Sequence, residues 1–359
     1  MSSPNQSFYS RYALESDLQA SVENSCSDFM ELRGARIFIT GGTGYIGRWL
    51  VEALCYANVT LDLNVELTLL TRNPGRFAEL CPHLTGNSCV SLLEGDVRTF
   101  SLLGQEYSHL IHAATDIERP VDAIETFDVT VSGTKRALEF AASSGVKKML
   151  ILSSGAIYGQ QQGICSTQSE KMPSLVDVND PKNAYGLGKI ATEWLGNVYS
   201  DTYGFDVITA RIFAQIGPNM PLDAHFAAGN FIRDAIAGES IIIKGDGLSV
   251  RSYMHASDLV SWLIAILVRG ESRSAYNVGS SHGISIRELA QAISRIVVGN
   301  SAKITVLGRP APGAAPPFYV PDITRATKSL GLSIKVPIDC AIAQTVRWYQ
   351  YQRKQRWTV

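Results

Sequence analysis

From residue 35 onward, short runs of β-branched and other apolar residues alternate with longer stretches in which apolar residues recur at helical spacing. This alternation is typical of an α/β protein in which a doubly wound parallel sheet carries helices on both faces. The rhythm changes after about Gly217, where proline, glycine and aspartate become frequent, and a smaller C-terminal lobe is predicted there. The predicted strands are 36–40, 66–71, 90–94, 109–112, 148–153 and 206–212.

The same pattern divides the chain into three predicted segments. Residues 1–34 contain no recognisable site and are expected to form an appended helical arm or a partly disordered lead. Residues 35–216 are predicted to form the large sheet domain. Residues 217–359 are predicted to form mainly the smaller lobe, built partly on insertions after the late strands.

The composition limits the class of protein. The chain has 359 residues, of which 45% are hydrophobic and 18% charged, so it is long enough for one large domain or two lobes. Its formal net charge of -1 predicts no broad basic surface, and neither nucleic acid nor a membrane is expected as a partner. The polar N-terminus and the lack of a long apolar run predict a cytoplasmic protein. Six cysteines are scattered without metal-ligand spacing, so reduced thiols and no metal site are predicted.

Three spaced glycines follow the first predicted strand, where a helical pattern begins. Gly41 allows a tight turn from strand to helix, Gly44 allows the backbone to approach a pyrophosphate, and Gly47 allows close packing of the helix on the strand. The phosphates of a dinucleotide then lie at a helix N-terminus, where free N–H groups favour negative charge. A glycine-rich turn without a ligand is the alternative that this motif alone leaves open. The predicted cofactor-binding residues of this loop are Gly41, Thr43, Gly44, Tyr45, Ile46 and Gly47.

The end of the second predicted strand bears on the choice of cofactor. An acidic residue there would bind the adenosine ribose of NAD(H), but the sequence has Arg72, which can pair with a 2′-phosphate. NADP(H) is therefore favoured over NAD(H), unless Arg72 is only a solvated surface residue. Asp96 and Val97, after the third strand, are placed to contact the adenine. Ala113 and Ala114, after the fourth strand, leave room for the dinucleotide.

A phenol and an ammonium group, those of Tyr185 and Lys189, are four residues apart in a helical pattern and hence on one face of the helix. The lysine charge and an oxidised nicotinamide both favour the phenolate, which brings Tyr185 towards the range in which it can act as a base. Ser154 follows the fifth predicted strand, and its hydroxyl can polarise a substrate oxygen at the same place. A surface tyrosine and lysine are the alternative, but the order of glycine loop, strand-end serine and this pair favours catalysis.

These motifs resemble the extended short-chain dehydrogenase/reductase family, in particular the NAD-dependent epimerase/dehydratase group that modifies nucleotide-activated sugars. The resemblance covers about residues 35–332 and implies a Rossmann fold with a C-terminal α/β lobe that binds a nucleotide-diphosphate sugar. It implies that Ser154, Tyr185 and Lys189 are catalytic, with Lys189 also holding the nicotinamide ribose. Arg251 and Asn230 match family residues that bind the substrate diphosphate, a task that suits a guanidinium fork. The matching motifs are 41–47, 153–159, the pair 185 and 189, 211–213, 251–258 and 276–279.

Several positions depart from the family pattern. The 4,6-dehydratases of the family carry two acids at the end of the fifth strand to eliminate water, and its nucleotide-sugar decarboxylases carry a glutamate at the second place. Here these places hold Gly155 and Ala156, which disfavours dehydration and decarboxylation. Ala214 stands where an asparagine is frequent, and Gln215 can replace that substrate contact. Thr130 also stands where an asparagine is usual.

The remaining chemistry is hydride transfer between an alcohol and a ketone, most simply at C4 of a hexose. A 4-epimerase that keeps its cofactor bound and oxidised is placed slightly first, and a 4-ketoreductase that uses NADPH is favoured by Arg72. A non-catalytic NADP-binding regulator is a third interpretation, against which the pair of Tyr185 and Lys189 counts. Dihydroflavonol-type and steroid-type reductases are a fourth, to which Arg251 and Asn230 are less suited.

Two predicted helices, at about 123–142 and 185–203, carry more apolar residues than one core face requires. In the family the corresponding helices pair across a dimer, so a homodimer is expected. The family also implies a role in polysaccharide biosynthesis. The nucleotide base and the sugar stay open, because the loops after Gly217 contain no pattern that specifies them.

Overall fold

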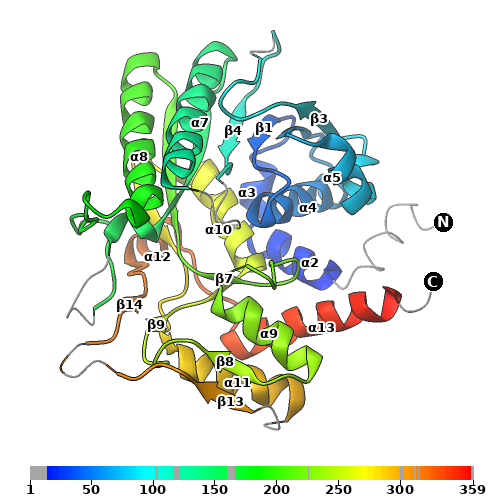
Figure 1. The fold of residues 1–359 in the computed structure, drawn as a ribbon. Helices are drawn as coiled ribbons and strands as arrows, with labels where there is room; N and C mark the ends of the chain where they lie inside the picture. The colour runs from blue at the N-terminus through cyan, green and yellow to red at the C-terminus, as the bar shows by residue number, and fades with distance from the viewer. Residues whose placement is uncertain are drawn as a thin grey trace.

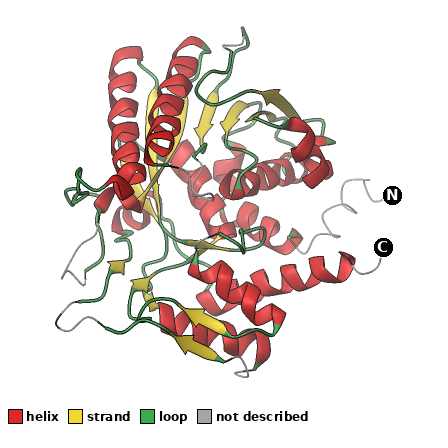
Figure 2. Ribbon diagram, in the orientation of Figure 1, coloured by secondary structure: helices red, strands yellow, loops and turns green. Residues whose placement is uncertain are grey.

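A seven-stranded parallel sheet forms the centre of the protein in this computed structural model, which describes residues 14–101, 104–115, 122–159, 166–224, 226–299, 303–310, 313 and 315–356. Its strands are β1 (Arg36–Thr40), β2 (Glu66–Thr71), β3 (Val90–Glu94), β4 (His109–His112), β5 (Lys148–Ser154), β6 (Asp206–Ile212) and β11 (Ala275–Val278). Their order is β11-β6-β5-β4-β1-β2-β3, and all neighbouring pairs are parallel (Figure 1 and Figure 2). The chain reverses its direction across the sheet after β3, so a ligand crevice is expected between the ends of β1 and β4.

The doubly wound α/β class that the apolar pattern predicts is confirmed. The predicted strands agree with the structure to within one residue, the difference being Ser154, which extends β5. The seventh strand, β11, was not predicted as a strand. It has only 4 residues and lies beyond the change of rhythm at Gly217.

Helices cover both faces of this sheet. They are α2 (Glu15–Asn24), α3 (Cys26–Met30), α4 (Tyr45–Thr60), α5 (Pro74–Leu80), α6 (Pro82–Thr85), α7 (Ala123–Ser143), α8 (Ala184–Tyr203), α10 (Ala256–Arg269) and α12 (Thr324–Leu330), with short 3-10 helices η1 (Gly155–Tyr158) and η2 (Pro181–Asn183). Ile37 and Ile39 of β1 pack in one cluster with α4 and α10, whereas Phe38 packs with α7 on the opposite face. No helix in the described ranges combines the length and apolar character that a membrane span requires.

A smaller lobe, in the lower part of Figure 1, is built from the C-terminal part of the chain. Its elements are α9 (Ala227–Ala237), α11 (Ile286–Val298), α13 (Ile338–Arg356), β7 (Gln215–Ile216), β8 (Ile241–Ile243), β9 (Val250–Arg251), β10 (Met254–His255), β12 (Ile284–Ser285), β13 (Ile304–Val306) and β14 (Phe318–Tyr319). Phe231, Ile293 and Ile342 from its three helices are buried together. The chain beyond residue 217 also supplies β11 to the seven-stranded sheet and α10 to the helices that cover it. The predicted domain boundaries stay a prediction.

The N-terminal extension is part of the core from residue 14 onward. Leu18, Phe29 and Leu32 are fully buried in the cluster that contains α4 and α10. The carboxylate of Asp28 pairs with the guanidinium of Arg269 at 2.6 Å. Residues 14–34 are thus helical and packed for most of their length, and residues 1–13 of the predicted extension lie outside the described residues.

Asp17 links this extension to the C-terminal helix. Its side chain is buried, and its Oδ1 accepts a hydrogen bond of 3.0 Å from Nε2 of Gln344 on α13. Burial raises the pKa of Asp17 from 3.8 to about 7, and the charge of Arg347 opposes this shift. The native carboxyl group therefore keeps its proton to a higher pH than the same group in the unfolded chain.

We predict that Asp17→Asn stabilises the protein above about pH 7 and has little effect near pH 4. Between these values the native wild type binds more protons than the unfolded state, so its free energy of unfolding falls as the pH rises. The variant lacks this titration and gains more than about 1 kcal/mol at about pH 8. Urea unfolding at both pH values measures the difference, with Glu31→Gln, at an exposed acid of the same extension, as the control. An equal effect of Asp17→Asn at both pH values contradicts the prediction.

Candidate active site

The glycine loop between β1 and α4 packs closely against the end of β4. Gly41 has a φ of +71°, which favours glycine, and a Cβ there would lie 2.6 Å from the backbone of Ala113 and Ala114. A Cβ on Gly47 would lie 2.1 Å from the carbonyl oxygen of Gly41. These contacts hold the N-terminus of α4, which begins after Gly44, over the edge of the sheet. The N–H groups of a first helical turn lack partners within the helix, which suits the binding of an anion.

The other loop residues differ in what they offer a cofactor. Thr43 and Ile46 are partly exposed. Tyr45 packs against both large hydrophobic clusters, and its buried hydroxyl has no hydrogen-bond partner among the described residues. Burial raises the pKa of Tyr45. The group that Tyr45 can offer a dinucleotide is therefore its backbone N–H rather than its phenol.

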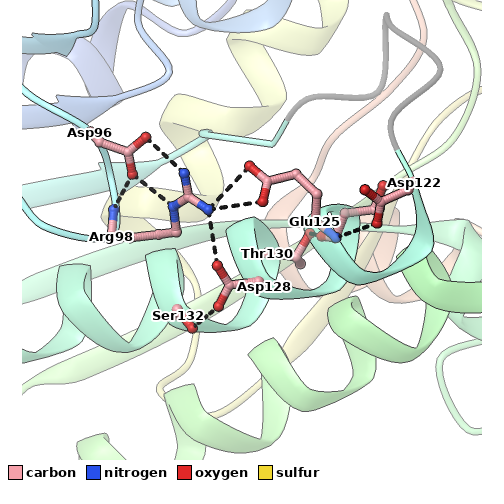
Figure 3. Close-up of polar contacts among 8 residues, drawn as sticks. Asp96, Arg98, Asp122, Glu125, Asp128, Thr130 and Ser132 are labelled. Atoms are coloured by element: carbon pink, nitrogen blue, oxygen red, sulfur yellow. Dashed lines mark hydrogen bonds and ion pairs between the residues drawn. The ribbon is translucent and has the colours of Figure 1, made fainter.

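Charged side chains gather beside α7, where the adenosine end of a dinucleotide is predicted to bind. Arg98 donates to the two oxygens of Asp96 at 2.9 and 3.2 Å, and also to Glu125 and Asp128 on α7 (Figure 3). These bonds from Arg98 hold the pKa of Asp96 low, and the charge of Arg72 adds to the effect. Arg72 itself is exposed at the end of β2. Arg98 was not predicted from the sequence, yet it fixes the orientation of Asp96.

Residues around the predicted adenine site also pack tightly on α7. Val97 is buried against Gly133, where a Cβ would lie 2.8 Å from Cγ1 of Val97. The hydroxyl of Thr130 donates to the carbonyl oxygen of Thr126 on its own helix at 2.7 Å. The methyl group of Thr130 lies 3.0 Å from the position of a Cβ on Gly188. Thr130 thus packs between α7 and α8 and does not present its hydroxyl to a ligand.

The structure brings Ser154, Tyr185 and Lys189 together at the end of β5. Nζ of Lys189 donates to the carbonyl oxygen of Leu152 at 2.7 Å and to Oγ1 of Thr115 at 2.9 Å. It also lies 5.7 Å from the centre of the Tyr185 ring. The hydroxyl of Ser154 is near enough to the phenol of Tyr185 to lower its pKa. A serine hydroxyl, a phenol and an ammonium group therefore share one place, as acid–base chemistry at an alcohol requires.

Burial changes the proton affinity of both titratable groups. It raises the pKa of Tyr185, an effect that the hydrogen bond with Ser154 opposes. It lowers the pKa of Lys189 to about 8, against the charge of Glu193. This differs from the sequence-based expectation, which considered only charges that favour the phenolate. For Tyr185 to act as a base near neutral pH, those charges must exceed the effect of burial.

A partly buried ion pair, whose side chains are 13% and 14% exposed, lies beside the end of β5. Arg211 on β6 donates through Nε and Nη2 to Glu193 on α8, at 3.0 and 2.7 Å. Glu193 also accepts a hydrogen bond of 2.5 Å from Ser153, and Arg211 donates to the hydroxyl of Tyr158 at 2.9 Å. Arg211, the arginine of the family motif, therefore has its hydrogen-bond partners within the protein. Glu193, which was not predicted from the sequence, balances its charge.

The predicted substrate contacts occupy different parts of the smaller lobe. Cζ of Arg251 on β9 lies 5.2 Å from the centre of the Tyr319 ring. Asn230 on α9 accepts a hydrogen bond of 3.1 Å from Arg233 through its amide oxygen. Gln215 on β7 has a buried amide oxygen without a partner among the described residues. Of these three residues, Arg251 is the one whose described neighbour, Tyr319, lies beside the end of β5.

Tyr319 on β14 is a residue of the site that was not predicted from the sequence. Its hydroxyl oxygen lies 2.6 Å from the position that a Cβ on Gly155 would take, next to Ser154 in the chain. Its ring packs on Phe213 with 4.6 Å between ring centres. Tyr319 is far from Ser154 in the sequence and follows a proline-rich stretch without periodicity. The one local indication of a close neighbour is the glycine at position 155.

Three known proteins resemble this chain in sequence or fold. The sequence is 28% identical over 318 residues to UDP-glucuronic acid decarboxylase 1 from Xenopus tropicalis, and the match covers 88% of this chain and 72% of that protein. The fold is similar to that of UDP-glucose 4-epimerase with UDP-glucose from Thermotoga maritima, with a TM-score of 0.73 and 21% identity over 89% of this chain and 99% of the other. UDP-glucuronic acid 4-epimerase from Bacillus cereus in complex with NAD also has a TM-score of 0.73, with 21% identity over 88% of this chain and 99% of the other.

The family as a whole gives a further comparison. The sequence profile described as the NAD dependent epimerase/dehydratase family matches residues 37–279. The match runs from the strand before the glycine loop to the residue after β11 and covers more than half of the chain. It confirms the resemblance that the motifs predict. This protein therefore belongs to the NAD dependent epimerase/dehydratase family of enzymes.

Proposed function

We propose that this protein is an NAD(P)-dependent epimerase of a nucleotide-diphosphate sugar, which inverts C4 of a hexose through a 4-keto intermediate. The proposal rests on the groups at the end of β5. Ser154, Tyr185 and Lys189 provide what hydride transfer at an alcohol requires. The two residues that follow Ser154 are Gly155 and Ala156, which cannot act as acids.

The shape of the glycine loop fits a dinucleotide. A Cβ on Gly41 or Gly47 would collide with the backbone, so the loop is too tightly packed for side chains at these positions. Such a loop before a helix N-terminus suits the binding of a pyrophosphate. Arg72 and Asp96, at the ends of neighbouring strands, are proposed to contact the adenosine. Lys189 is proposed to hold the nicotinamide ribose. When bound, an oxidised nicotinamide supplies the hydride acceptor for the sugar carbon.

The side chains of the protein accept and return the proton of the C4 hydroxyl. Tyr185 accepts the proton of the C4 hydroxyl, while Ser154 donates a hydrogen bond to the same oxygen. Lys189, whose pKa of about 8 leaves it mostly charged at neutral pH, stabilises the phenolate, with its Nζ 5.7 Å from the centre of the ring. Tyr185 would then return this proton to the oxygen of the keto sugar, and a bound nicotinamide would supply the hydride to its other face, which would give the 4-epimer.

Residues 155 and 156 separate this protein from family members that remove a group from the sugar. The relative from Xenopus tropicalis is named as a decarboxylase. The resemblance described above implies two acids at this strand end in the dehydratases of the family. Here a glycine and an alanine occupy these places, so the proposed product has the same atoms as the substrate. Arg251 is the proposed anchor of the diphosphate about which the keto sugar turns. Asn230 and Gln215 are proposed as further substrate contacts.

A second function, reduction of a 4-keto sugar by NADPH, is favoured by one observation. Arg72 is exposed at the end of β2, where a carboxylate would otherwise bind the ribose of NAD. A guanidinium group there can pair with the 2′-phosphate of NADP. In a reductase the cofactor leaves after each turnover, whereas an epimerase keeps it bound.

We expect the purified protein, given NAD⁺ or NADP⁺ and UDP-glucose or UDP-glucuronic acid, to form the 4-epimer of the sugar that it accepts. Proton NMR and mass spectrometry of the nucleotide sugar measure this conversion, which leaves the mass unchanged. Tyr185→Phe lowers kcat by about 10²-fold or more, because it removes the proton acceptor. Tyr203→Phe, at an exposed position of the same helix, is the control and keeps the activity. Loss of carbon dioxide or water contradicts the proposal, and turnover only of a 4-keto sugar with NADPH favours the reductase.

Arg72→Ala tests the choice of cofactor. The variant is expected to bind NADP⁺ about 10–100-fold more weakly, because a charge-assisted contact with phosphate is lost, and NAD⁺ with an affinity within about twofold. Calorimetric titration of protein freed of bound nucleotide measures both affinities. Arg76→Ala, at an exposed position of α5, is the matched control. An equal loss for both cofactors, or no loss, is incompatible with an arginine that binds the 2′-phosphate.

The exposed face of α7 and α8 supports a homodimer as part of this proposal. Ile124 and Phe127 on α7 and Trp194 on α8 are 84%, 41% and 63% exposed, although all three are large apolar side chains. The two helices lie side by side in Figure 1 and pack on each other. Pairing of this face with its copy buries these side chains in a two-fold interface.

Trp194→Glu is expected to convert the dimer into a monomer, because it places a charge in the proposed interface. Light scattering on the eluted protein at about micromolar concentration measures the mass. Leu80→Glu is the control, since Leu80 on α5 is 62% exposed but lies on another face. A monomeric wild type contradicts the proposed dimer. A dimer that Leu80→Glu disrupts and Trp194→Glu does not shows that the interface is not on α7 and α8.

A further inference from the structure

Two cysteine thiols from different layers of the protein are in contact. Sγ of Cys55 on α4 and Sγ of Cys89, in the turn before β3, lie 3.7 Å apart and share a hydrogen bond. Both are free thiols in this structure. They are 34 residues apart in the chain, so the fold brings them together. Because a disulfide bond is about 2.05 Å long, the two sulfurs need to approach by less than about 2 Å to form one.

The backbone around the pair keeps the two thiols opposite each other. The carbonyl oxygen of Cys89 accepts a hydrogen bond of 2.7 Å from the N–H of Leu67 on β2. Asn58, which follows Cys55 on α4, donates to the carbonyl oxygen of Val65 at 3.3 Å and accepts from its N–H at 2.8 Å. Helix α4 and the turn before β3 are therefore both bonded to the start of β2.

The two thiols differ in their surroundings. Cys55 is fully buried, whereas Cys89 is partly exposed. The hydrogen bond from Cys55 lowers the pKa of Cys89, and the same bond, together with burial, raises the pKa of Cys55. The shared proton therefore stays on Cys55, and Cys89 is the thiol that ionises. A partly exposed thiolate is the form of cysteine that small oxidants attack, and a neighbouring thiol can resolve the product.

We propose that Cys55 and Cys89 form a site of reversible oxidation, at which hydrogen peroxide converts the two thiols into a disulfide that ties α4 to the edge strand β3 and stabilises the fold. The thiolate of Cys89 attacks one oxygen of the peroxide, the O–O bond breaks, and a sulfenic acid and hydroxide form. The sulfur of Cys55 then attacks the sulfenic sulfur. An S–S bond forms, the S–O bond breaks, and the leaving hydroxide takes the thiol proton as water. The two sulfurs lose two electrons in total, and the peroxide gains them.

The position of the pair separates this site from the predicted dinucleotide crevice. Cys89 precedes the amino end of β3, whereas Asp96 follows its carboxyl end. Cys55 lies about 15 Å along α4 from the first turn of that helix. Strand β3 is the last in the order of the sheet, so it has a neighbouring strand on one side only. A bond from α4 to this edge limits the freedom of the unfolded chain without filling the crevice.

The first arm of the test maps the disulfide in the full chain. Reduced protein is treated with hydrogen peroxide until the exposed Cys26 is oxidised, the remaining thiols are alkylated after denaturation, and unreduced peptides are analysed by tandem mass spectrometry. We expect a peptide pair joined through Cys55 and Cys89, which dithiothreitol separates. Cys89→Ala loses this pair. Cys81→Ala, at a buried thiol of the neighbouring segment, is the matched control and keeps it. Alkylated Cys55 and Cys89, or cross-links to other cysteines instead, overturn the proposal.

The second arm measures the effect of the bond on stability. The oxidised wild type is expected to melt about 2–8 °C above the reduced protein, because the cross-link restrains the unfolded chain between residues 55 and 89. Cys89→Ala after the same treatment shows no such rise, which separates the effect of the bond from that of oxidation elsewhere. A cross-linked wild type that melts at or below the temperature of the reduced protein overturns the proposal that the bond stabilises the fold. Both arms are independent of the proposed function, since neither uses a substrate or a cofactor.

Discussion

The close approach of backbone segments at the end of β1 is the constraint on which the rest of the site depends. Gly47 touches the carbonyl oxygen of Gly41, and Gly41 touches the backbone after β4, at separations that admit no side chain on either glycine. Helix α4 therefore begins directly over the edge of the sheet, at the point where the chain changes direction across it. β5 is the next strand beyond β4, so Ser154 and the facing residues of α8 lie beside the same crevice.

The charged groups around this crevice are mostly balanced within the protein. Glu193 neutralises Arg211 behind β5, and acids after β3 and on α7 surround Arg98. Lys189 is buried next to Tyr185, where its charge is screened less than it would be at the surface. Control of the phenol at position 185 then depends on a few short-range groups, Ser154 and Lys189 among them.

The doubly wound sheet could be predicted from the sequence because strands that are buried on both faces are continuous apolar runs. The glycine loop and the pair of Tyr185 and Lys189 are also local, since their members are only a few residues apart. Tyr319 could not be predicted, because it reaches the end of β5 through packing between segments far apart in the chain. Arg98 is only two residues from Asp96, but its bonds to Glu125 and Asp128 on α7 depend on the fold. The effect of burial on Tyr185 was missed for the same reason: charges can be read from a sequence, but the exclusion of water depends on the folded structure.

Transfer of a hydride from C4 and its return without exchange with water is the central claim for this enzyme. Conversion of the accepted nucleotide sugar in D₂O tests it most directly, with NMR of the product as the measurement. We predict that the 4-epimer carries no deuterium on carbon, because only the proton held by Tyr185 exchanges with solvent. A product with one deuterium on a ring carbon would contradict the claim, because it shows that a carbon-bound proton was removed and replaced from water.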